Sequence, residues 1–490
     1  MIPQSEELTQ RFYPEPDIQP QTPAFDGREG FSTHADVVQF LRAYQAPAGA
    51  SYQIDTIGQS QNGLPILMAY LGSNKPDALR IWVMGGLHGD EPGGWEGIMH
   101  FMNRLHEADK RDWLSNVKLA ILPMANPDGC NSLNRLAANG LDLNRDQTKL
   151  LAPESMLWKK AFNAFQPEIA LDMHEYRAFR KDYLRMGTQG MAAYYDVCFL
   201  YSGNLNVPDE LRQYTRTAFV AQAERWMDSL QLSHHPYFTS DEVKGTRVIN
   251  QGSVHARSSA SHHALTNCIS TLIEVRGVRL GRTSLKRRVL ASSSVILSYL
   301  QYARSHQQEV RNVLERARQA QADPVVRSQR KEEQRKLLLI DLAKKDTVRV
   351  SLPVRDAFLS GSTLTRKRPK AYVIRQVDEE ITNRLNALGV SFRWVSAPTE
   401  LRAEAYRITA LNPDAFDWEG VRPVEVTTQI EPISLSIDPE TSKAIWIDLD
   451  QQNAPLIFEL LEPEAQNSFV HLGLISATQD LHLPIYRILP

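Results

Sequence analysis

The sequence predicts an α/β fold followed by a smaller, strand-rich α+β domain. Between Phe31 and about Ser305, short apolar runs alternate with segments of helical spacing, as in a sheet covered by helices. The apolar runs are bounded by polar or turn-forming residues, which is typical of buried parallel strands. From about Asp346 onward the pattern becomes rich in strands, including the alternating run Ala444–Asp448, and holds one predicted helix at Glu379–Leu388.

The elements are predicted in a definite order along the chain. Residues 1–30 are expected to form an extended arm, because five prolines fall within the first 23 positions and disfavour a helix. Residues 31–300 are expected to form the α/β domain, with its main strands at Leu79–Met84, Val117–Pro123, Ile169–Met173 and Ser270–Val275. Its clearest helical patterns are Trp95–His106 and Pro208–Leu230, the second of which opens with Pro-Asp-Glu as a helix start does.

The stretch 301–345 differs in character from the domains on either side. It holds 11 Lys and Arg against 6 Asp and Glu and is interrupted at Pro324. We expect a solvated, basic helical connector here, with a basic patch for a partner or a membrane surface as the alternative. Residues 346–490 are then expected to form an accessory domain, because they contain few residues in catalytic arrangements.

The composition excludes several classes of protein. With 42% hydrophobic and 23% charged residues and a net charge of −2 over 490 residues, the chain is neither wholly disordered nor collagen-like. The balanced charge predicts no nucleic-acid partner, and the three cysteines, which lack CxxC spacing, are expected to be reduced and buried. No run approaches the ~18 apolar residues of a membrane span. The first residues lack the apolar core of a signal peptide, so we expect a cytoplasmic protein, or a periplasmic or secreted one if a signal has been removed.

The strongest chemical signal follows the first strong strand, in the string Gly85-Gly-Leu-His-Gly-Asp-Glu91. His88 and Glu91 lie three residues apart where a strand enters a helix, so their side chains can converge on one point. His174 occupies the matching position after another predicted strand, at the sheet edge where ligands bind in open α/β folds. Imidazole and carboxylate are good zinc ligands, and three of them leave a fourth position for water. Because position 178 is Ala, the HExxH pattern of other metalloproteases is excluded.

A hydrolytic zinc site also needs a general base, charge stabilisation and a means of positioning substrate. Glu274 ends an apolar strand, where a carboxylate is costly unless it faces a functional cavity. Arg135, Asn144 and Arg145 fall in one short segment; a single arginine suits an oxyanion, and an Asn–Arg pair suits a substrate carboxylate. Asp142, in the same segment, can hold a ligand histidine in the required tautomer.

These residues together resemble the M14 zinc carboxypeptidases. The matching order is His88-x-x-Glu91, Asn126-Pro-Asp-Gly129, Arg135, Asp142-Leu-Asn-Arg145, His174 and Glu274. The resemblance covers about residues 30–300, the expected catalytic domain, and implies a mixed, mostly parallel sheet flanked by helices. The strand-rich C-terminal region is similar to the appendage of larger bacterial M14 proteins.

The resemblance implies a role for each of these residues. One zinc ion per chain binds to His88, Glu91 and His174, and Glu274 is the general base for a zinc-activated water. Arg135 polarises the scissile carbonyl, Arg145 with Asn144 grips the terminal carboxylate, and Asp142 hydrogen-bonds His88. The implied function is a metallocarboxypeptidase that hydrolyses the C-terminal amide bond of a peptide, or peptide-like substrate, with a free carboxylate.

Two positions depart from the pattern of the family. Asp90 precedes Glu91 where pancreatic-type members carry an arginine, and His-Gly-Asp-Glu resembles bacterial cell-wall-peptide amidases and the succinylglutamate desuccinylase group. His263 stands eleven residues before Glu274, where the closest branch has its substrate-capping tyrosine. We expect His263 to contact substrate as a hydrogen-bond donor in place of that phenol, with a surface histidine as the alternative.

Two other functions stay open at this point. The first is a zinc amidase or deacylase of the same superfamily, acting on the γ-D-glutamyl bond of murein peptides or on N-acyl amino acids. Arg135 and the Asn126-Pro-Asp-Gly129 segment argue against its desuccinylase-like form. The second is a catalytically inactive peptide-binding protein, against which the complete set of ligands, base and arginines argues.

Overall fold

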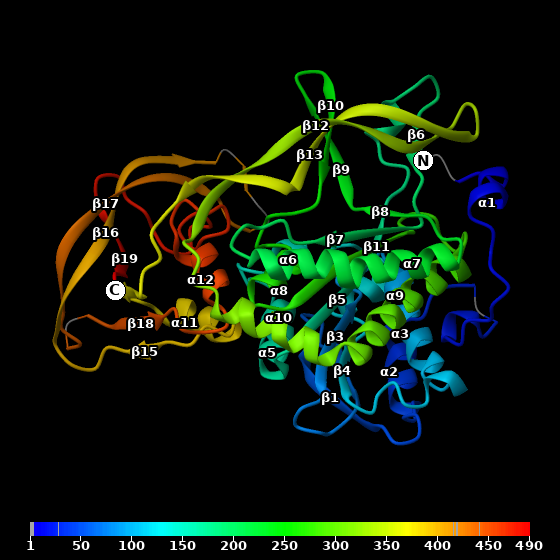
Figure 1. The fold of residues 1–490 in the computed structure, drawn as a ribbon, viewed down its shortest axis with the longest axis horizontal. Coiled ribbons are helices and arrows are strands. Elements are labelled where there is room, and N and C mark those ends of the chain that lie inside the picture. Colours follow the sequence, from blue (N-terminus) through cyan, green and yellow to red (C-terminus); the bar gives the residue numbers. More distant parts are fainter. Residues whose placement is uncertain (1–3, 28, 415, 418–419, 441) are drawn as a thin grey trace.

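An eight-stranded mixed sheet forms the centre of the larger of two lobes (Figure 1). The computed structural model describes residues 4–27, 29–414, 416–417, 420–440 and 442–490. The strand order is β1-β2-β4-β3-β5-β11-β7-β8, with parallel pairing through β4, β3, β5 and β11. The strands are β1 Ser51–Gln59, β2 Pro65–Gly72, β3 Leu79–Gly85, β4 Val117–Leu122, β5 Ile169–Tyr176, β7 Val197–Tyr201, β8 His234–Pro236 and β11 Ile269–Arg276. The predicted α/β class is confirmed, and the four strands read from apolar runs are β3, β4, β5 and β11.

Helices cover both faces of this sheet. Helix α3 packs against α9 so closely that a Cβ on Gly97 would lie 2.2 Å from the Cβ of Ser292, which only glycine avoids. Trp82, Trp95 and Trp158 are fully buried in the layers on either side of the sheet. The helices of this lobe are α2 His34–Ala43, α3 Pro92–Arg104, α4 Pro127–Ser132, α5 Pro153–Phe165, α6 Asp209–Tyr214, α7 Ala221–Ser229, α8 Ser259–Leu265, α9 Leu285–Ser305 and α10 Gln307–Gln319, with a π-helical turn at Thr215–Val220.

A second sheet, of five strands, arches over the first (Figure 1). Its order is β6-β12-β13-β10-β9, with β6 Met191–Ala193, β9 Phe238–Val243, β10 Thr246–Gln251, β12 Val325–Asp341 and β13 Asp346–Thr365. The long hairpin β12–β13 therefore pairs with strands far back in the sequence: Leu339 of β12 with Ala193 of β6, and Val354 of β13 with Ile249 of β10, the latter in parallel. The expectation of a helical connector over 301–345 is wrong beyond Gln319. Charged residues of high helix propensity give that stretch a helical composition, but pairing with β13 and β6 holds it as a strand.

The smaller lobe is a six-stranded antiparallel sheet with two helices. Its strand order is β15-β18-β14-β19-β16-β17. The elements are β14 Ala371–Arg375, α11 Glu379–Ala387, β15 Arg393–Trp394, β16 Thr399–Pro413, β17 Val424–Ile437, β18 Ala444–Asp448, α12 Ala454–Leu461 and β19 His482–Ile488. A strand-rich α+β domain is therefore present as predicted. Its first strand begins at residue 371 rather than near 346, because β13 belongs to the arching sheet.

The N-terminal arm is not extended throughout. Residues Glu6–Phe12 form helix α1, with Ser5 as its N-cap and two glutamates in its first turn. The prolines that disfavour a helix fall outside this segment. Its serine N-cap, with acidic residues in the first turn and a basic residue in the last, stabilises a helix. After α1 the arm crosses the larger lobe, where the buried Tyr13 donates a hydrogen bond to Tyr194 O at 2.5 Å.

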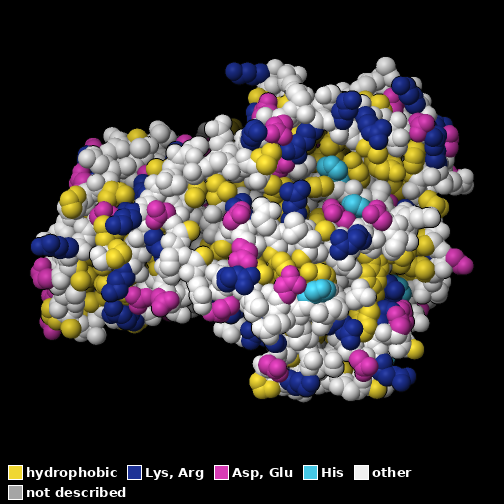
Figure 2. Space-filling view, viewed as in Figure 1, with side chains coloured by type: hydrophobic (Ala, Val, Ile, Leu, Met, Phe, Trp, Pro, Cys, Tyr) yellow, Lys and Arg dark blue, Asp and Glu magenta, His cyan; other side chains and the backbone are white. Residues whose placement is uncertain are grey.

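The surface shows no region of a single charge on the face drawn in Figure 2, where basic and acidic side chains are interspersed. All three cysteines are buried. Within the described ranges, no helix has both the length and the apolar character to cross a membrane.

The two lobes meet around a buried carboxylate on α12. Oε1 of Glu459 accepts hydrogen bonds from the side-chain amides of Asn204 (2.8 Å) and Asn206 (2.7 Å), both in the loop after β7. Burial raises the pKa of Glu459 to about 7, although the two amides act in the opposite direction. The raised pKa makes this lobe contact sensitive to pH.

We expect stability to fall as the pH rises through this range. A folded-state pKa of about 7 against an unfolded value of 4.5 means that the folded protein retains this proton between these pH values and the unfolded chain does not. The retained proton of Glu459 contributes at most about 3 kcal/mol to the free energy of unfolding. This contribution is complete below pH 4.5 and is lost by about pH 7. Glu459→Gln mimics the neutral form, so it should raise the melting temperature at pH 8 and leave it nearly unchanged at pH 4.5. Equal shifts at both pH values in differential scanning fluorimetry would contradict this.

Candidate metal centre and the cavity around it

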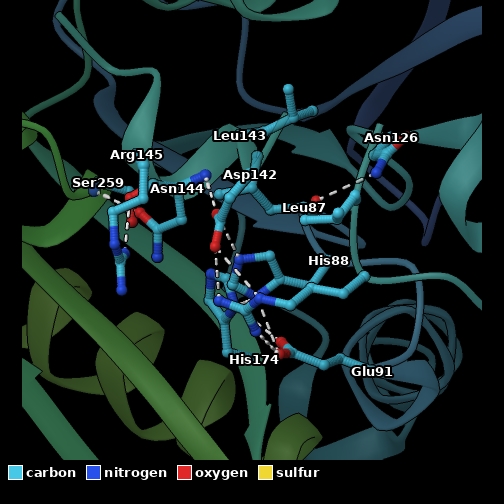
Figure 3. Close-up of polar contacts among 12 residues, drawn as sticks. Leu87, His88, Glu91, Asn126, Asp142, Leu143, Asn144, Arg145, His174 and Ser259 are labelled. Carbon is cyan, nitrogen blue, oxygen red and sulfur yellow. Dashed lines mark hydrogen bonds and ion pairs between the residues drawn. The ribbon is translucent and has the colours of Figure 1, made fainter. Parts of the chain in front are cut away.

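Three buried side chains converge at the C-terminal edge of the large sheet (Figure 3). His88 follows β3, Glu91 is the residue before α3, and His174 lies near the end of β5. One ligand atom from each residue lies within 4.8 Å of the others. Nδ1 of His88 is 2.8 Å from Glu91 Oε1, and Nδ1 of His174 is 2.7 Å from Glu91 Oε2. Parallel β3 and β5 are adjacent, so the strand-end residues meet.

The hydrogen bonds on the far side of each ring define the imidazole tautomers. Nε2 of His88 lies 3.0 Å from Asp142 Oδ1, and Nε2 of His174 lies 2.8 Å from Asp172 Oδ2. With a metal ion at the common point, each Nε2 would donate its proton to the carboxylate behind it, and both Nδ1 lone pairs would face the ion. The two Nδ1 atoms are 3.1 Å apart, and ligands of tetrahedral zinc at bond lengths of 2.0–2.1 Å lie about 3.3 Å apart. The residues therefore fit a zinc ion.

The charged groups of this cluster shift one another's pKa values. Although burial alone acts the other way, His88 and His174 hold the pKa of Glu91 well below its ordinary value. Likewise burial lowers the pKa of His174, but the charges of Asp172 and Glu91 outweigh it and raise that pKa. A buried anionic carboxylate and two imidazole rings whose Nδ1 atoms point at the same place form a donor set suited to a dication.

Asp172 is a candidate site residue that the sequence analysis missed. It lies two positions before His174 on β5, is buried, and also accepts a hydrogen bond from Ser259 Oγ at 2.5 Å. The spacing in Ile169-Ala-Leu-Asp-Met-His174 was the available signal, because residues i and i+2 of a strand share one face.

We predict that Asp172→Asn weakens zinc binding by about 10- to 100-fold, the usual effect of removing a carboxylate behind a ligand histidine. Competition with a zinc chelator measures the affinity. Ser259→Ala is the matched control, since it removes the other hydrogen bond of Asp172 without affecting His174. Unchanged zinc affinity in Asp172→Asn would show that this carboxylate does not orient the ring.

Glu274 lies beside His174 in the parallel register of β11 and β5. It is 8% exposed and faces the cavity that His88 and Glu91 also line. Burial and the negative charge of Glu91 raise the pKa of Glu274 to about 7, against the lowering effects of His174, His88 and Arg135. A carboxylate with a pKa near neutrality can accept and return a proton, as a general base requires.

The segment before and within the 3₁₀ turn Leu143–Arg145 brings the other predicted side chains to the same place. Arg135 donates to Asp142 Oδ2 at 2.8 Å and to Glu91 Oε1 at 3.3 Å, and its side chain is 40% exposed. The side-chain oxygen of Asn144 accepts a hydrogen bond from Ser259 N at 2.8 Å, and the Arg145 side chain lies beside it (Figure 3). Arg135, Asn144 and Arg145 all line the cavity.

The cavity has a volume of about 750 Å³, and some of the residues that line it were not identified in the sequence analysis. Tyr237 lines it, and burial together with the charge of Glu274 raises the pKa of this phenol well above its usual value. The hydroxyl is therefore a neutral donor near Glu274. No sequence motif surrounds Tyr237, which reaches the cavity only because the loop between β8 and β9 lies over β7.

His263 does not face this cavity, in contrast to the expectation. Helix α8 directs it into the core, where it is 1% exposed and stacked on Phe162 with ring centroids 4.3 Å apart. Burial and the charge of Lys159 lower its pKa well below the usual value, so it is a neutral core residue. The motif spacing located the helix but not the direction of this side chain.

Comparisons with known proteins find carboxypeptidases. A family model described as zinc carboxypeptidase matches residues 37–173. The chain is similar to Carboxypeptidase 2 of Trichophyton rubrum, with 28% identity over 424 residues, 84% of this chain and 76% of that protein. It is also similar to Carboxypeptidase 2 of Trichophyton equinum, with 27% identity over 453 residues, 88% of this chain and 81% of that protein. A solved metallo-carboxypeptidase from Burkholderia cenocepacia aligns over 55% of this chain and 69% of its own, at 18% identity and a TM-score of 0.43.

Proposed function

Because this chain belongs to the M14 zinc carboxypeptidase family and is a metallocarboxypeptidase, we propose that zinc binds to His88, Glu91 and His174 and that Glu274 is the general base. The reaction is hydrolysis of the C-terminal amide bond of a peptide. One observation carries the proposal: one ligand atom each of the buried His88, Glu91 and His174 lie within 4.8 Å of one another, beside a cavity that Glu274 and Arg145 line. The proposed base, the proposed metal ligands and the proposed anchor for the substrate carboxylate therefore lie close together.

The residues of the cavity divide the chemistry between them. Zinc bound there supplies a Lewis acid that polarises a carbonyl and lowers the pKa of water. Glu274 accepts the proton of the attacking water and returns it to the leaving amine. Arg135, held by Asp142, donates hydrogen bonds to the oxygen on which negative charge develops.

Arg145 and Asn144 position the substrate by its terminal carboxylate. The hydrogen bond from Ser259 N holds the Asn144 carbonyl oxygen, so its amide nitrogen is oriented to donate beside the Arg145 guanidinium. A planar guanidinium binds a carboxylate through two hydrogen bonds, which an ammonium cannot reproduce.

We predict that Arg145→Lys lowers kcat/KM by about 10- to 100-fold, mainly through KM, because a hydrogen bond between charged groups contributes about 1.5–3 kcal/mol. Steady-state kinetics on one peptide measures this. The same peptide with an amidated C-terminus is the control: it should be a poor substrate for the parent enzyme and respond little to Arg145→Lys. Equal loss on both peptides would show that Arg145 does not read the terminal carboxylate.

A substrate panel with and without a zinc chelator tests the proposed function against its alternatives. We expect chelator-sensitive release of C-terminal residues from ordinary peptides. Faster hydrolysis of a murein tripeptide would instead favour the γ-D-glutamyl amidase, which shares Asp90 before Glu91, and hydrolysis of N-succinyl or N-acetyl amino acids would favour the deacylase. Zinc-loaded protein that binds peptide without cleaving any substrate would support the inactive binding protein.

A further inference from the structure

The cavity extends past the metal centre along the direction of β5. Ser259, which is hydrogen-bonded to the residue before Arg145, also donates to Asp172 at 2.5 Å, so the proposed carboxylate anchor is level with Asp172. His174 comes two residues later on the strand, and Arg177, which lines the cavity, three residues after that. Arg177 therefore lies beyond His174, on the side away from Arg145.

A second arginine reaches the same end of the cavity from the neighbouring strand. In the parallel pairing of β5 with β11, Arg276 lies opposite Tyr176, so the segments that follow the two strands leave the sheet side by side. Arg279 lies three residues after Arg276 and also lines the cavity, with an exposed side chain. It occupies a turn that is closed by a hydrogen bond from Leu280 N to Gly277 O at 3.0 Å.

These two arginines act on each other and lack an acidic partner. Burial, followed by the charges of Arg279 and Arg180, lowers the pKa of Arg177, with Asp182 opposing them. Arg177 is half-buried, and its Nε is buried without a hydrogen-bond partner. Neither Arg177 nor Arg279 forms an ion pair with a residue that the structure describes. A half-buried guanidinium in this state is costly until an anion binds to it.

Acidic residues line the same cavity, but three of them belong to the metal centre or lie beside it. The acids of the lining are Asp90, Glu91, Glu175, Asp241 and Glu274. Glu91 and Glu274 are the proposed ligand and the proposed base. Burial and the charge of Glu91 raise the pKa of Asp90, and Arg135 is the cation that most opposes them. Asp90 is therefore placed beside the metal centre and Arg135.

The acids nearest to the arginine pair along the chain are bound by other arginines. Glu175 is buried and accepts hydrogen bonds from Arg288 at 2.6 and 2.8 Å. Asp182 accepts two hydrogen bonds from Arg180, each of 3.1 Å, and Arg180 itself lines the cavity. Each of these carboxylates thus already balances one guanidinium group.

The remaining charges of the lining belong to the other end of the cavity. Burial, followed by the charges of three arginines, lowers the pKa of His255 to about 3; the three are Arg257, Arg330 and Arg145. Asp241 is exposed on β9 and is among the acids that act on Arg330. The end of the cavity beyond His174 therefore keeps the unbalanced charges of Arg177 and Arg279.

We propose that Arg177 and Arg279 form a subsite for acidic side chains upstream of the scissile bond, so that the enzyme prefers peptides with Glu or Asp shortly before the C-terminal residue. This inference rests on the proposed function, because it takes Arg145 as the anchor and the metal centre as the position of the scissile bond. A parallel strand rises about 3.3 Å per residue, so His174 and Arg177 are about 10 Å apart, the span of roughly three residues of an extended peptide. The subsite therefore serves the three residues before the C-terminal one.

The test uses peptides that end in Leu and carry a single Glu, or the isosteric Gln, at one of the three preceding positions. At one or more of these positions we expect kcat/KM for Glu to exceed that for Gln by about 5- to 10-fold, between the effects of an exposed ion pair and of a hydrogen bond between charged groups. The ratio should fall towards one in ~1 M salt, which screens such charges. Equal rates for Glu and Gln at all three positions would overturn the inference.

Substitutions assign the preference to the two arginines. Arg177→Gln and Arg279→Asn should each lower the ratio of the Glu to the Gln rate, and the double variant should bring it to about one. The φ of Arg279 is +67°, a conformation that asparagine adopts more readily than arginine, so Arg279→Asn should fold even if Arg177→Gln does not. Lys181→Gln is the matched control, because it removes an exposed charge four residues after Arg177 that does not line the cavity. A ratio that survives in the double variant, or that Lys181→Gln lowers equally, would contradict the assignment.

Peptide binding to the zinc-loaded Glu274→Gln variant separates this inference from the proposed function. Fluorescence anisotropy with labelled peptides of the same series measures the affinity without cleavage. Tighter binding of the Glu peptide than of the Gln peptide, lost when Arg177→Gln is added, supports the subsite even if the parent protein cleaves no peptide. Cleavage by the parent without any preference for Glu in rate or binding supports the proposed function and rejects the subsite.

Discussion

Glu274→Gln is expected to lower turnover by at least ~100-fold while leaving zinc binding intact, since removing one acid–base group typically costs two to four orders of magnitude. Glutamine keeps the size of the side chain and its place beside His174 in the β11–β5 register. It cannot accept and return a proton. Because Glu274 is outside the convergent group of His88, Glu91 and His174, the zinc content should not change.

The protein offers a closely matched control for this substitution. Glu459 is also a buried glutamate with a pKa raised to about 7, but it lies on α12 and is absent from the cavity lining. Glu459→Gln should keep parent turnover. Single-turnover kinetics with zinc-loaded protein, together with metal analysis, distinguishes the outcomes. Undiminished turnover in Glu274→Gln would rule out this residue as the base.

His174→Ala is expected to abolish stoichiometric zinc binding and, with it, activity. Loss of a carboxylate behind a ligand already lowers the affinity for zinc by about 10- to 100-fold. Loss of the ligand itself should therefore lower that affinity by more than ~100-fold. The remaining His88 and Glu91 supply only two protein ligands, too few for a catalytic zinc site. Elemental analysis after dialysis against a weak chelator gives the stoichiometry.

A histidine far from the cavity serves as the control for that experiment. His306 lies at the exposed junction of α9 and α10, where its ring stacks on Tyr302. His306→Ala should retain one zinc per chain and parent activity. If His174→Ala retained equimolar zinc, the ion would have to be held elsewhere, and the assignment of the centre would fail.

Much of the metal centre could be predicted from sequence because its residues follow strands. Apolar runs located β3, β5 and β11, and the carboxyl ends of adjacent parallel strands meet at one edge. His88, His174 and Glu274 are therefore near one another once the strands are correctly identified. Asp142 was predictable from its motif, and its contact with His88 at 3.0 Å agrees with the implied role.

Other parts of the site depend on interactions that no local pattern encodes. The burial of His263 against Phe162 is decided by the rotation of α8, which motif spacing leaves free. The strand β12 has a helix-like composition, and only its long-range partners β13 and β6 decide its state. Arg330, which lines the cavity, lies on β12 where the pairing with β13 is irregular. Tyr237 lies in the loop between β8 and β9, whose path depends on tertiary contacts.

The parallel pairing of β10 with β13 also bears on how the protein is made. During synthesis, the ligand residues and Glu274 leave the ribosome well before the hairpin that completes the arching sheet. Until then, β10 presents an open edge to other chains, and unpaired edges of this kind promote aggregation. A fragment that stops at residue 300 would carry all three proposed ligands but lack the hairpin that covers this edge of β10. We therefore expect it to be recovered mainly as insoluble material, whereas a fragment extended through Thr365 should be soluble to a much greater extent.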